Sequence, residues 1–146
     1  MNVAVIDSTT DSPVRTRGMA GFSLMELMIT IVIISTLAAI AVPIYNNNVR
    51  RAIQTESDMA LKNIYNNLRV YEAEFEFWPM SANPEPVVGA DWNTIGVGEL
   101  DGRYFTDASY TYSSADGIRF TLTCAKGAYL EYDRVMNESG TISDSE

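Results

Sequence analysis

The stretch that decides the fold reads GMAGFSLMELMITIVIISTLAAIAVPIY and covers residues 18–45. It is a long apolar run of helix-forming residues, and its single charged residue is Glu26, close to the start. A charge inside an apolar span is costly, so Glu26 is a candidate functional residue. Residues 22–45 would extend about 36 Å as an α-helix, which is enough to cross a bilayer.

Two ordinary segments share this composition, namely a secretory signal peptide and a single-pass membrane anchor. A signal peptide has a shorter apolar region, with the cleavage site at its far end. In this chain the run is longer, and the small residue Gly21 precedes it. Basic residues flank the run on both sides, so flanking charge does not decide the orientation of an anchor. Neither alternative accounts for Glu26.

The composition of the whole chain excludes several classes of function. The 146 residues carry a net charge of −9, and they include no histidine and one cysteine, Cys124. The acidic balance disfavours phosphate backbones, so we expect no general nucleic-acid binding. Without histidine there is no Ser-His or Cys-His nucleophile and no imidazole zinc site. We therefore expect no enzyme, catalytic residue, metal or cofactor, and we expect Cys124 to be a small buried side chain.

The heptapeptide GFSLMEL at residues 21–27, followed by an Ile/Val/Ala run and Pro43, resembles the class III signal of type IV pilins and pseudopilins. The resemblance implies that a prepilin peptidase cleaves between Gly21 and Phe22 and then N-methylates Phe22. Residues 1–21 would be the removed leader. A first mature residue of phenylalanine resembles the type IVa group, although this leader is long for that group, so the translation start stays open.

The same resemblance implies a structural subunit of a type IV pilus or related filament. The precursor would be a single-pass protein of the bacterial inner membrane, and the mature subunit would enter an extracellular or periplasmic filament. There the carboxylate of Glu26 would pair with the Phe22 amine of a neighbouring subunit, because an unpaired buried charge penalises a wrong register. The implied partners are the prepilin peptidase and methylase, other pilin subunits and, indirectly, an assembly ATPase and an inner-membrane platform.

Alternative functions remain open at this point. A major-type pseudopilin of a type II secretion system would carry the same signal, and a non-polymerising membrane-anchored binding domain would carry a similar helix. Major and minor pilins are not separated, nor are roles in cell adhesion, twitching motility, DNA uptake or electron transfer. Some secretion pseudopilins bind calcium in a loop. The loop carboxylates Asp91, Glu99 and Asp101 have no EF-hand spacing, so we favour solvated side chains there.

Two residues of the apolar run affect the helix itself. Pro43 lacks a backbone N–H, which removes one helical hydrogen bond and predicts a kink. Ser35 stands where the family commonly has glycine, which would make unwinding of the helix during assembly harder. We expect residues 22–45 to be the transmembrane and assembly half of one long helix.

An apolar stripe continues this helix, with members at spacings of three, four or seven residues. They are Val49, Ile53, Ala60, Ile64, Leu68, Tyr71 and Phe75. The stripe predicts that residues 46–78 form an amphipathic second half, ended by Trp78-Pro79. The aromatic residues between Tyr71 and Trp78 are expected to join the core.

The rest of the chain predicts loops followed by strands. Residues 79–102 are rich in proline and glycine and read as a connecting loop with one short strand near Trp92. Residues 103–146 predict an antiparallel meander of three to four strands and a tail. Its first strand holds Tyr110 and Tyr112, and its turn is Asp116-Gly117. The second strand would place Ile118, Phe120, Leu122 and Cys124 on one face, and a third strand would cover residues 128–133. The predicted fold is α+β and pilin-like, with the sheet packed on the long helix.

Overall fold

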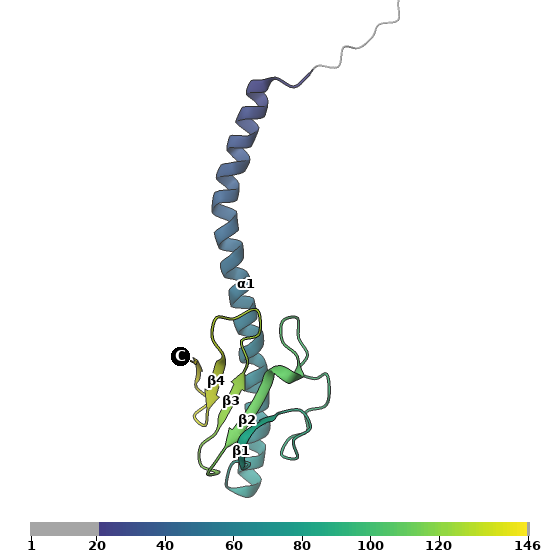
Figure 1. Ribbon diagram of the computed structural model, residues 1–146, viewed down its shortest axis with the longest axis vertical. Coiled ribbons are helices and arrows are strands. Elements are labelled where there is room, and N and C mark those ends of the chain that lie inside the picture. The colour runs from purple at the N-terminus through teal and green to yellow at the C-terminus, as the bar shows by residue number, and fades with distance from the viewer. Residues whose placement is uncertain (1–20, 146) are drawn as a thin grey trace, which may run out of the picture. The chain divides into compact units, whose positions relative to one another are not determined.

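The computed structural model describes residues 21–145, and it shows one long helix followed by a β-sheet (Figure 1). Helix α1 covers Leu24–Phe75. The chain divides into two compact units at the boundary between Ala39 and Ile40, so the sheet and the later part of α1 belong to the second unit. Apart from Gly21, the expected leader lies outside the described residues.

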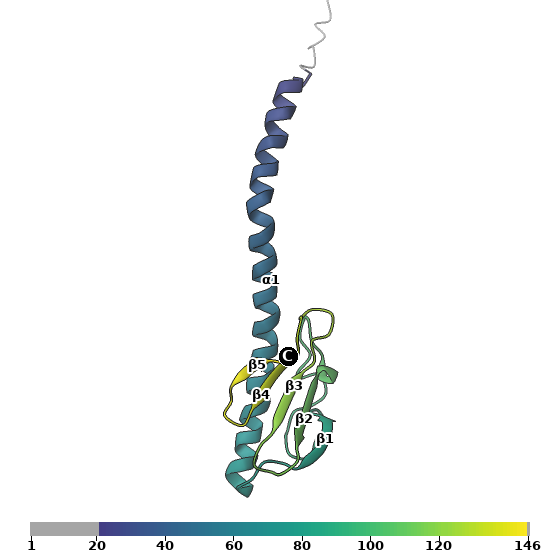
Figure 2. The same cartoon turned by 60° about the vertical axis from the view of Figure 1, so that its left-hand side comes forward.

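The second unit contains a five-stranded sheet in the order β1-β2-β3-β4-β5, with every neighbouring pair antiparallel. The strands are β1 Ser81–Pro86, β2 Tyr110–Ser114, β3 Thr121–Cys124, β4 Arg134–Asn137 and β5 Ile142–Asp144. A short 3-10 helix, η1 Asp107–Ser109, leads directly into β2. Figures 1 and 2 show the sheet lying along the C-terminal part of α1. The predicted α+β class is therefore confirmed, with five strands instead of three to four.

The extra strand is β1, which occupies a segment expected to be a loop. Its sequence, SANPEP, contains two prolines. Proline is tolerated in an edge strand because the missing N–H then faces away from the ladder. β1 lies at the edge of the sheet, and its register with β2 shifts between Ser81 and Glu85. No strand forms near Trp92.

The expected strand over residues 128–133 is wrong. The amides of Tyr129 and Leu130 donate to the carbonyl of Lys126, which makes this stretch a turn. The alternation of Leu130 and Tyr132 predicts one face of a strand, but Tyr129 and Tyr132 are about half exposed, at 51% and 49%. The pairing with β3 begins only at Arg134.

The core lies between one face of α1 and the sheet. The helix contributes five buried residues at spacings of three or four, which is the stripe of an amphipathic helix. They are Ile53, Ser57, Leu61, Ile64 and Leu68. The predicted stripe is confirmed at Ile53, Ile64 and Leu68, whereas its centre, Ser57 and Leu61, was missed. The sheet contributes Tyr110, Tyr112, Leu122, Cys124 and Met136, all fully buried.

Three apolar side chains expected in the core lie outside it, namely Ile118, Phe75 and Phe77, and Phe77 is 45% exposed. Ile118 is 72% exposed because it belongs to the turn between β2 and β3 and not to a strand. Phe75 ends α1 beyond the reach of the sheet and is 45% exposed. Trp78 does enter the core, at 5% exposure. The free thiol of Cys124 is buried as expected, and that burial raises its pKa to about 12.

Candidate assembly site

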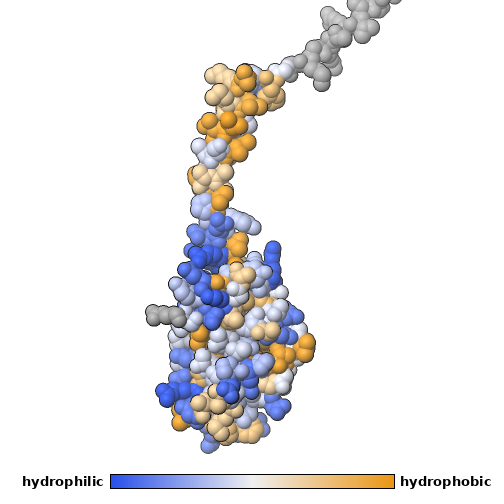
Figure 3. All heavy atoms as spheres, viewed as in Figure 1, coloured by the Kyte–Doolittle hydropathy of each residue, from blue (hydrophilic) through white to orange (hydrophobic). Residues whose placement is uncertain are grey.

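The side chains of the apolar run are not covered by any other part of residues 21–145. Every residue from 21 to 48 is exposed, including large apolar side chains such as Leu24, at 84%, and Ile40, at 64%. Figure 3 shows this segment as mainly hydrophobic surface. Among the described residues, α1 is the one helix that is long and apolar enough to cross a membrane. An apolar surface of this length requires a bilayer or other chains to cover it.

The hydroxyl groups in this run are satisfied within the helix. Thr30 donates to the carbonyl of Glu26 at 2.7 Å, Ser35 to that of Ile31 at 2.6 Å, and Thr36 to that of Ile33 at 2.8 Å. A hydroxyl that bonds back to its own helix can be placed in an apolar environment at low cost. Ser35, the departure from the expected glycine, therefore remains compatible with burial.

Ser23 caps the start of the helix. Its hydroxyl oxygen accepts the N–H of Met25 at 3.3 Å, and its carbonyl accepts the N–H of Leu27 at 3.1 Å. Sequence reasoning missed this role, although Ser23 and Glu26 have the S-x-x-E spacing of a capping box. The second half of that box is not formed. Glu26 lies in the first turn, where the helix dipole favours a negative charge.

The Glu26 carboxylate is thus left without a partner. It accepts no hydrogen bond and pairs with no cation anywhere in residues 21–145. Phe22, which precedes the helix, is 76% exposed, and Gly21 has open space where a side chain would be. These three predicted site residues therefore lie together at the exposed start of α1. Within residues 21–145, no atom lies close enough to require glycine at position 21.

Pro43, the other predicted site residue, lies inside α1. Because proline has no N–H, the carbonyl of Ala39, one turn earlier, loses its helical donor. The helix nonetheless continues through this position to Phe75.

A second carboxylate on the same helix, Glu56, holds the loop before η1. Its oxygens accept three consecutive backbone N–H groups, from Arg103 at 3.1 Å, Tyr104 at 2.8 Å and Phe105 at 3.0 Å. A side chain on Gly102 would collide with this carboxylate, so glycine is needed there. From sequence alone, Glu56 looks like an ordinary charge on the exposed side of the helix.

The acidic residues of the connecting segment also bind backbone groups. Asp107 accepts the N–H groups of Gly98 and Leu100, at 2.6 and 3.1 Å, and Asp101 accepts that of Asp107 at 2.9 Å. Glu99 accepts the N–H of Gly96 at 3.0 Å. Across the part of the chain that the structure describes, no group of three or more acidic or cysteine side chains is placed to hold a metal ion.

An ion-pair cluster ties the far edge of the sheet to the helix. Arg134 on β4 contacts both oxygens of Asp58 on α1, at 2.9 and 3.0 Å, and also pairs with Asp144 on β5. Burial acts to lower the pKa of Arg134, but the hydrogen bonds that Arg134 donates to Asp144 and Asp58 outweigh it and raise that pKa. This cluster links the C-terminal strands to the helix through one guanidinium that contacts two carboxylates.

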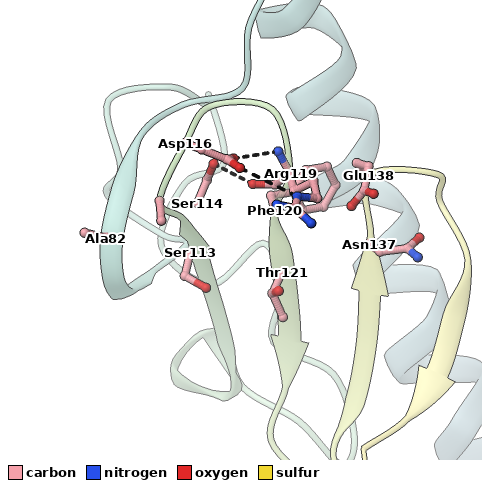
Figure 4. A pocket seen from close by; sticks show the side chains of 10 residues that line it. Ala82, Ser113, Ser114, Asp116, Arg119, Phe120, Thr121, Asn137 and Glu138 are labelled. Carbon is pink, nitrogen blue, oxygen red and sulfur yellow. Dashed lines mark hydrogen bonds and ion pairs between the residues drawn. The ribbon is translucent and has the colours of Figure 1, made fainter.

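An open pocket of about 410 Å³ lies beside the turn between β2 and β3 (Figure 4). Its side chains serve the turn itself. Asp116 accepts the N–H groups of Ile118 and Arg119, and these bonds, led by the one from Arg119, lower its pKa. Ser114 accepts the N–H of Gly117 and donates to the carbonyl of Arg119. The predicted Asp116-Gly117 turn is confirmed, with Gly117 at φ +67°.

Comparisons with known proteins match a family model around the start of α1 and relatives over a longer part of the chain. A family model described as the prokaryotic N-terminal methylation motif matches residues 16–42. A type IV major fimbrial protein FimA of Dichelobacter nodosus is 34% identical over 113 residues, which cover 73% of this chain and 68% of the relative. A fimbrial protein of the same organism is also 34% identical, with the same shares covered. No solved structure matches the chain.

Proposed function

This chain belongs to the type IV pilin family, and from that membership we propose that it is a structural subunit that polymerises through the N-terminal part of α1. The observation that carries the proposal is the Glu26 carboxylate, which has no partner in residues 21–145 and lies in the exposed apolar part of α1. A surface of that kind is stable only when something covers it and supplies a cation. Neighbouring copies of the same helix supply both.

In the proposed assembly, the leader ends at Gly21 and the new N-terminus is Phe22. The amine created there would be one helical turn from Glu26. Pairing between the amine of one subunit and the Glu26 carboxylate of its neighbour would remove two buried unpaired charges at once. The place of Gly21 within the matched N-terminal methylation motif supports a role in recognition by a prepilin peptidase.

We also propose where the subunit lies in the cell and which proteins act on it. The precursor would be held in the bacterial inner membrane by residues 22–45, and the mature subunit would be extracted into an extracellular filament. The peptidase and methylase would act first, followed by an assembly ATPase and a membrane platform. The fimbrial names of the relatives support a pilus over a type II secretion pseudopilus. We propose no catalytic activity for the chain.

The mass of the subunit in filaments tests this function. We expect filaments sheared from cells that make this chain to contain a polypeptide that begins at Phe22, carries one methyl group on its amine and retains the whole apolar run. A filament subunit that began after residue 45, or any other N-terminus, would contradict the proposal. Cells that make the chain without incorporating it into filaments would contradict it as well.

A further inference from the structure

Three aromatic rings lie against one another at the C-terminal end of α1. The ring centroids of Tyr71 and Phe75 are 4.4 Å apart, and those of Phe75 and Phe77 are 6.2 Å apart. Both phenylalanines nevertheless keep 45% of their surface exposed, and neighbouring Val70 keeps 68%. The rings therefore pack on each other and leave an apolar patch at the end of the helix.

A groove of about 470 Å³ extends this patch toward the loop that follows β1. The side chains that line it include Val70, Tyr71, Phe75 and Trp92. Trp92 is held in place, because its ring lies 4.8 Å from that of Tyr112 and its Nε1 donates to Glu85 at 3.1 Å. The groove thus has a fixed wall. We call the groove and the three rings, together with Glu74, Glu76 and Asp91, the distal surface.

The acidic members of the distal surface are unpaired. Glu74 and Asp91 line the groove, and Glu76 follows the end of α1 in a left-handed conformation at φ +66°. None of the three carboxylates accepts a hydrogen bond or meets a cation among the described residues. Glu72, by contrast, is occupied by Arg69 at 2.9 Å. An aromatic groove with free carboxylates suits a guanidinium group, which can pair with the acid and stack on a ring.

The opposite end of the same unit offers such groups. Arg50 and Arg51 are consecutive residues of α1, both exposed, and we call them the proximal patch. Arg51 is exposed and, within residues 21–145, has no acidic partner. Arg50 pairs with Glu131 at 3.2 Å, but both side chains are about two-thirds exposed, at 65% and 64%, so that pair contributes little. At the rise of an α-helix, Arg51 and Phe75 are about 36 Å apart.

We propose that the distal surface of one subunit binds the proximal patch of a second copy of this chain. The two surfaces are complementary in charge and too far apart to meet within one molecule. A contact between two different surfaces of identical subunits builds an open helical array when its rotation does not close a ring. The inference rests on the proposed function, and it names a contact of the sheet-bearing unit in addition to the one between apolar helices.

Charge reversal tests the contact in the full chain. We expect Glu74→Arg and Arg51→Glu each to reduce the yield of sheared filaments, because each one places like charges opposite each other. The double variant, Glu74→Arg with Arg51→Glu, recreates the attraction and should restore the yield. Lys62→Glu, at an exposed position of α1 outside both surfaces, is the matched control and should leave the yield unchanged. The amount of processed subunit in the membrane should be the same in all variants.

The outcomes separate this proposal from the proposed function. Unchanged yields in the single variants, or a double variant that stays defective, would overturn the contact while wild-type filaments uphold the function. A loss with Glu74→Arg but not with Arg51→Glu would mean that the distal surface binds something else, which also overturns it. Failure of the wild-type chain to enter filaments would instead count against the function itself.

Discussion

Two glutamates on one helix, Glu26 and Glu56, differ in what surrounds their carboxylates. Glu56 is saturated by three backbone N–H groups, whereas Glu26 has no partner in the described residues. A carboxylate whose oxygens accept several N–H groups stabilises the fold. A carboxylate without a partner in an apolar segment can pair with a cation of another subunit. Sequence reasoning identified Glu26 because a lone charge stands out in an apolar run. It missed Glu56 because the partners are loop amides nearly 50 residues away, which leave no sequence pattern.

The Glu56 contact leads to a stability prediction. Glu56→Ala leaves three backbone donors of residues 103–105 without an acceptor, so we expect the free energy of unfolding to fall by about 2–3 kcal/mol. Glu74→Ala removes an unpaired exposed carboxylate from the same helix and should change that energy by less than about 0.5 kcal/mol. Urea unfolding of the detergent-solubilised chain, followed by tryptophan fluorescence, measures both.

Gly102 allows the same contact to be tested by a double-mutant cycle with Glu56. Gly102→Ala should destabilise the wild-type chain, because the new Cβ collides with the Glu56 carboxylate. In the Glu56→Ala background the collision is gone, so the same substitution should cost much less. An equal loss of unfolding free energy in the two backgrounds would show that the Glu56 carboxylate does not lie against Gly102.

Helices and strands differ in how far the sequence predicts them. The long helix was predictable because its apolar residues recur at helical spacing from Ile53 to Leu68. β2 and the turn at Asp116-Gly117 were predictable from alternating tyrosines and turn residues. β1 was not, because its prolines are typical of loops and are accommodated only at a sheet edge, which is a property of the assembled sheet. The turn after Lys126 was expected to be a strand because Leu130 and Tyr132 alternate as on one face of a strand. In the structure Tyr132 is about half exposed, so no buried face forms there.

The helix–sheet packing gives a prediction at the level of the element. Leu61 is fully buried at the centre of the interface, so we expect Leu61→Ala to lower the free energy of unfolding by about 2–5 kcal/mol. Met59, on the same helix, is 66% exposed, and Met59→Ala should cost less than about 0.5 kcal/mol. The same urea titration compares them. Similar losses in the two variants would mean that the stripe through Leu61 does not face the sheet.

In the whole molecule, the second unit and the apolar run differ in whether their apolar surface is buried. The second unit buries its apolar residues between α1 and the sheet, and the run from Leu24 to Tyr45 leaves its own exposed. The sequence predicts this division because the two stretches have different patterns, one apolar all round and one amphipathic. The candidate site at Gly21, Phe22 and Glu26 was predictable from the motif. The distal surface was not, since it combines the end of α1 with a loop that folds beside it.

The proposed function depends most on the Glu26 carboxylate, which we propose drives assembly through the apolar helix. Glu26→Ala tests it most directly, with Thr30→Ala as a matched loss of one polar group in the next turn. The readouts are the yield of sheared filaments and the amount of cleaved subunit in the membrane. We expect Glu26→Ala to be cleaved normally but to form no filaments, because the neighbouring amine is left buried and unpaired, whereas Thr30→Ala should form them. Wild-type filament yield from Glu26→Ala would contradict the account.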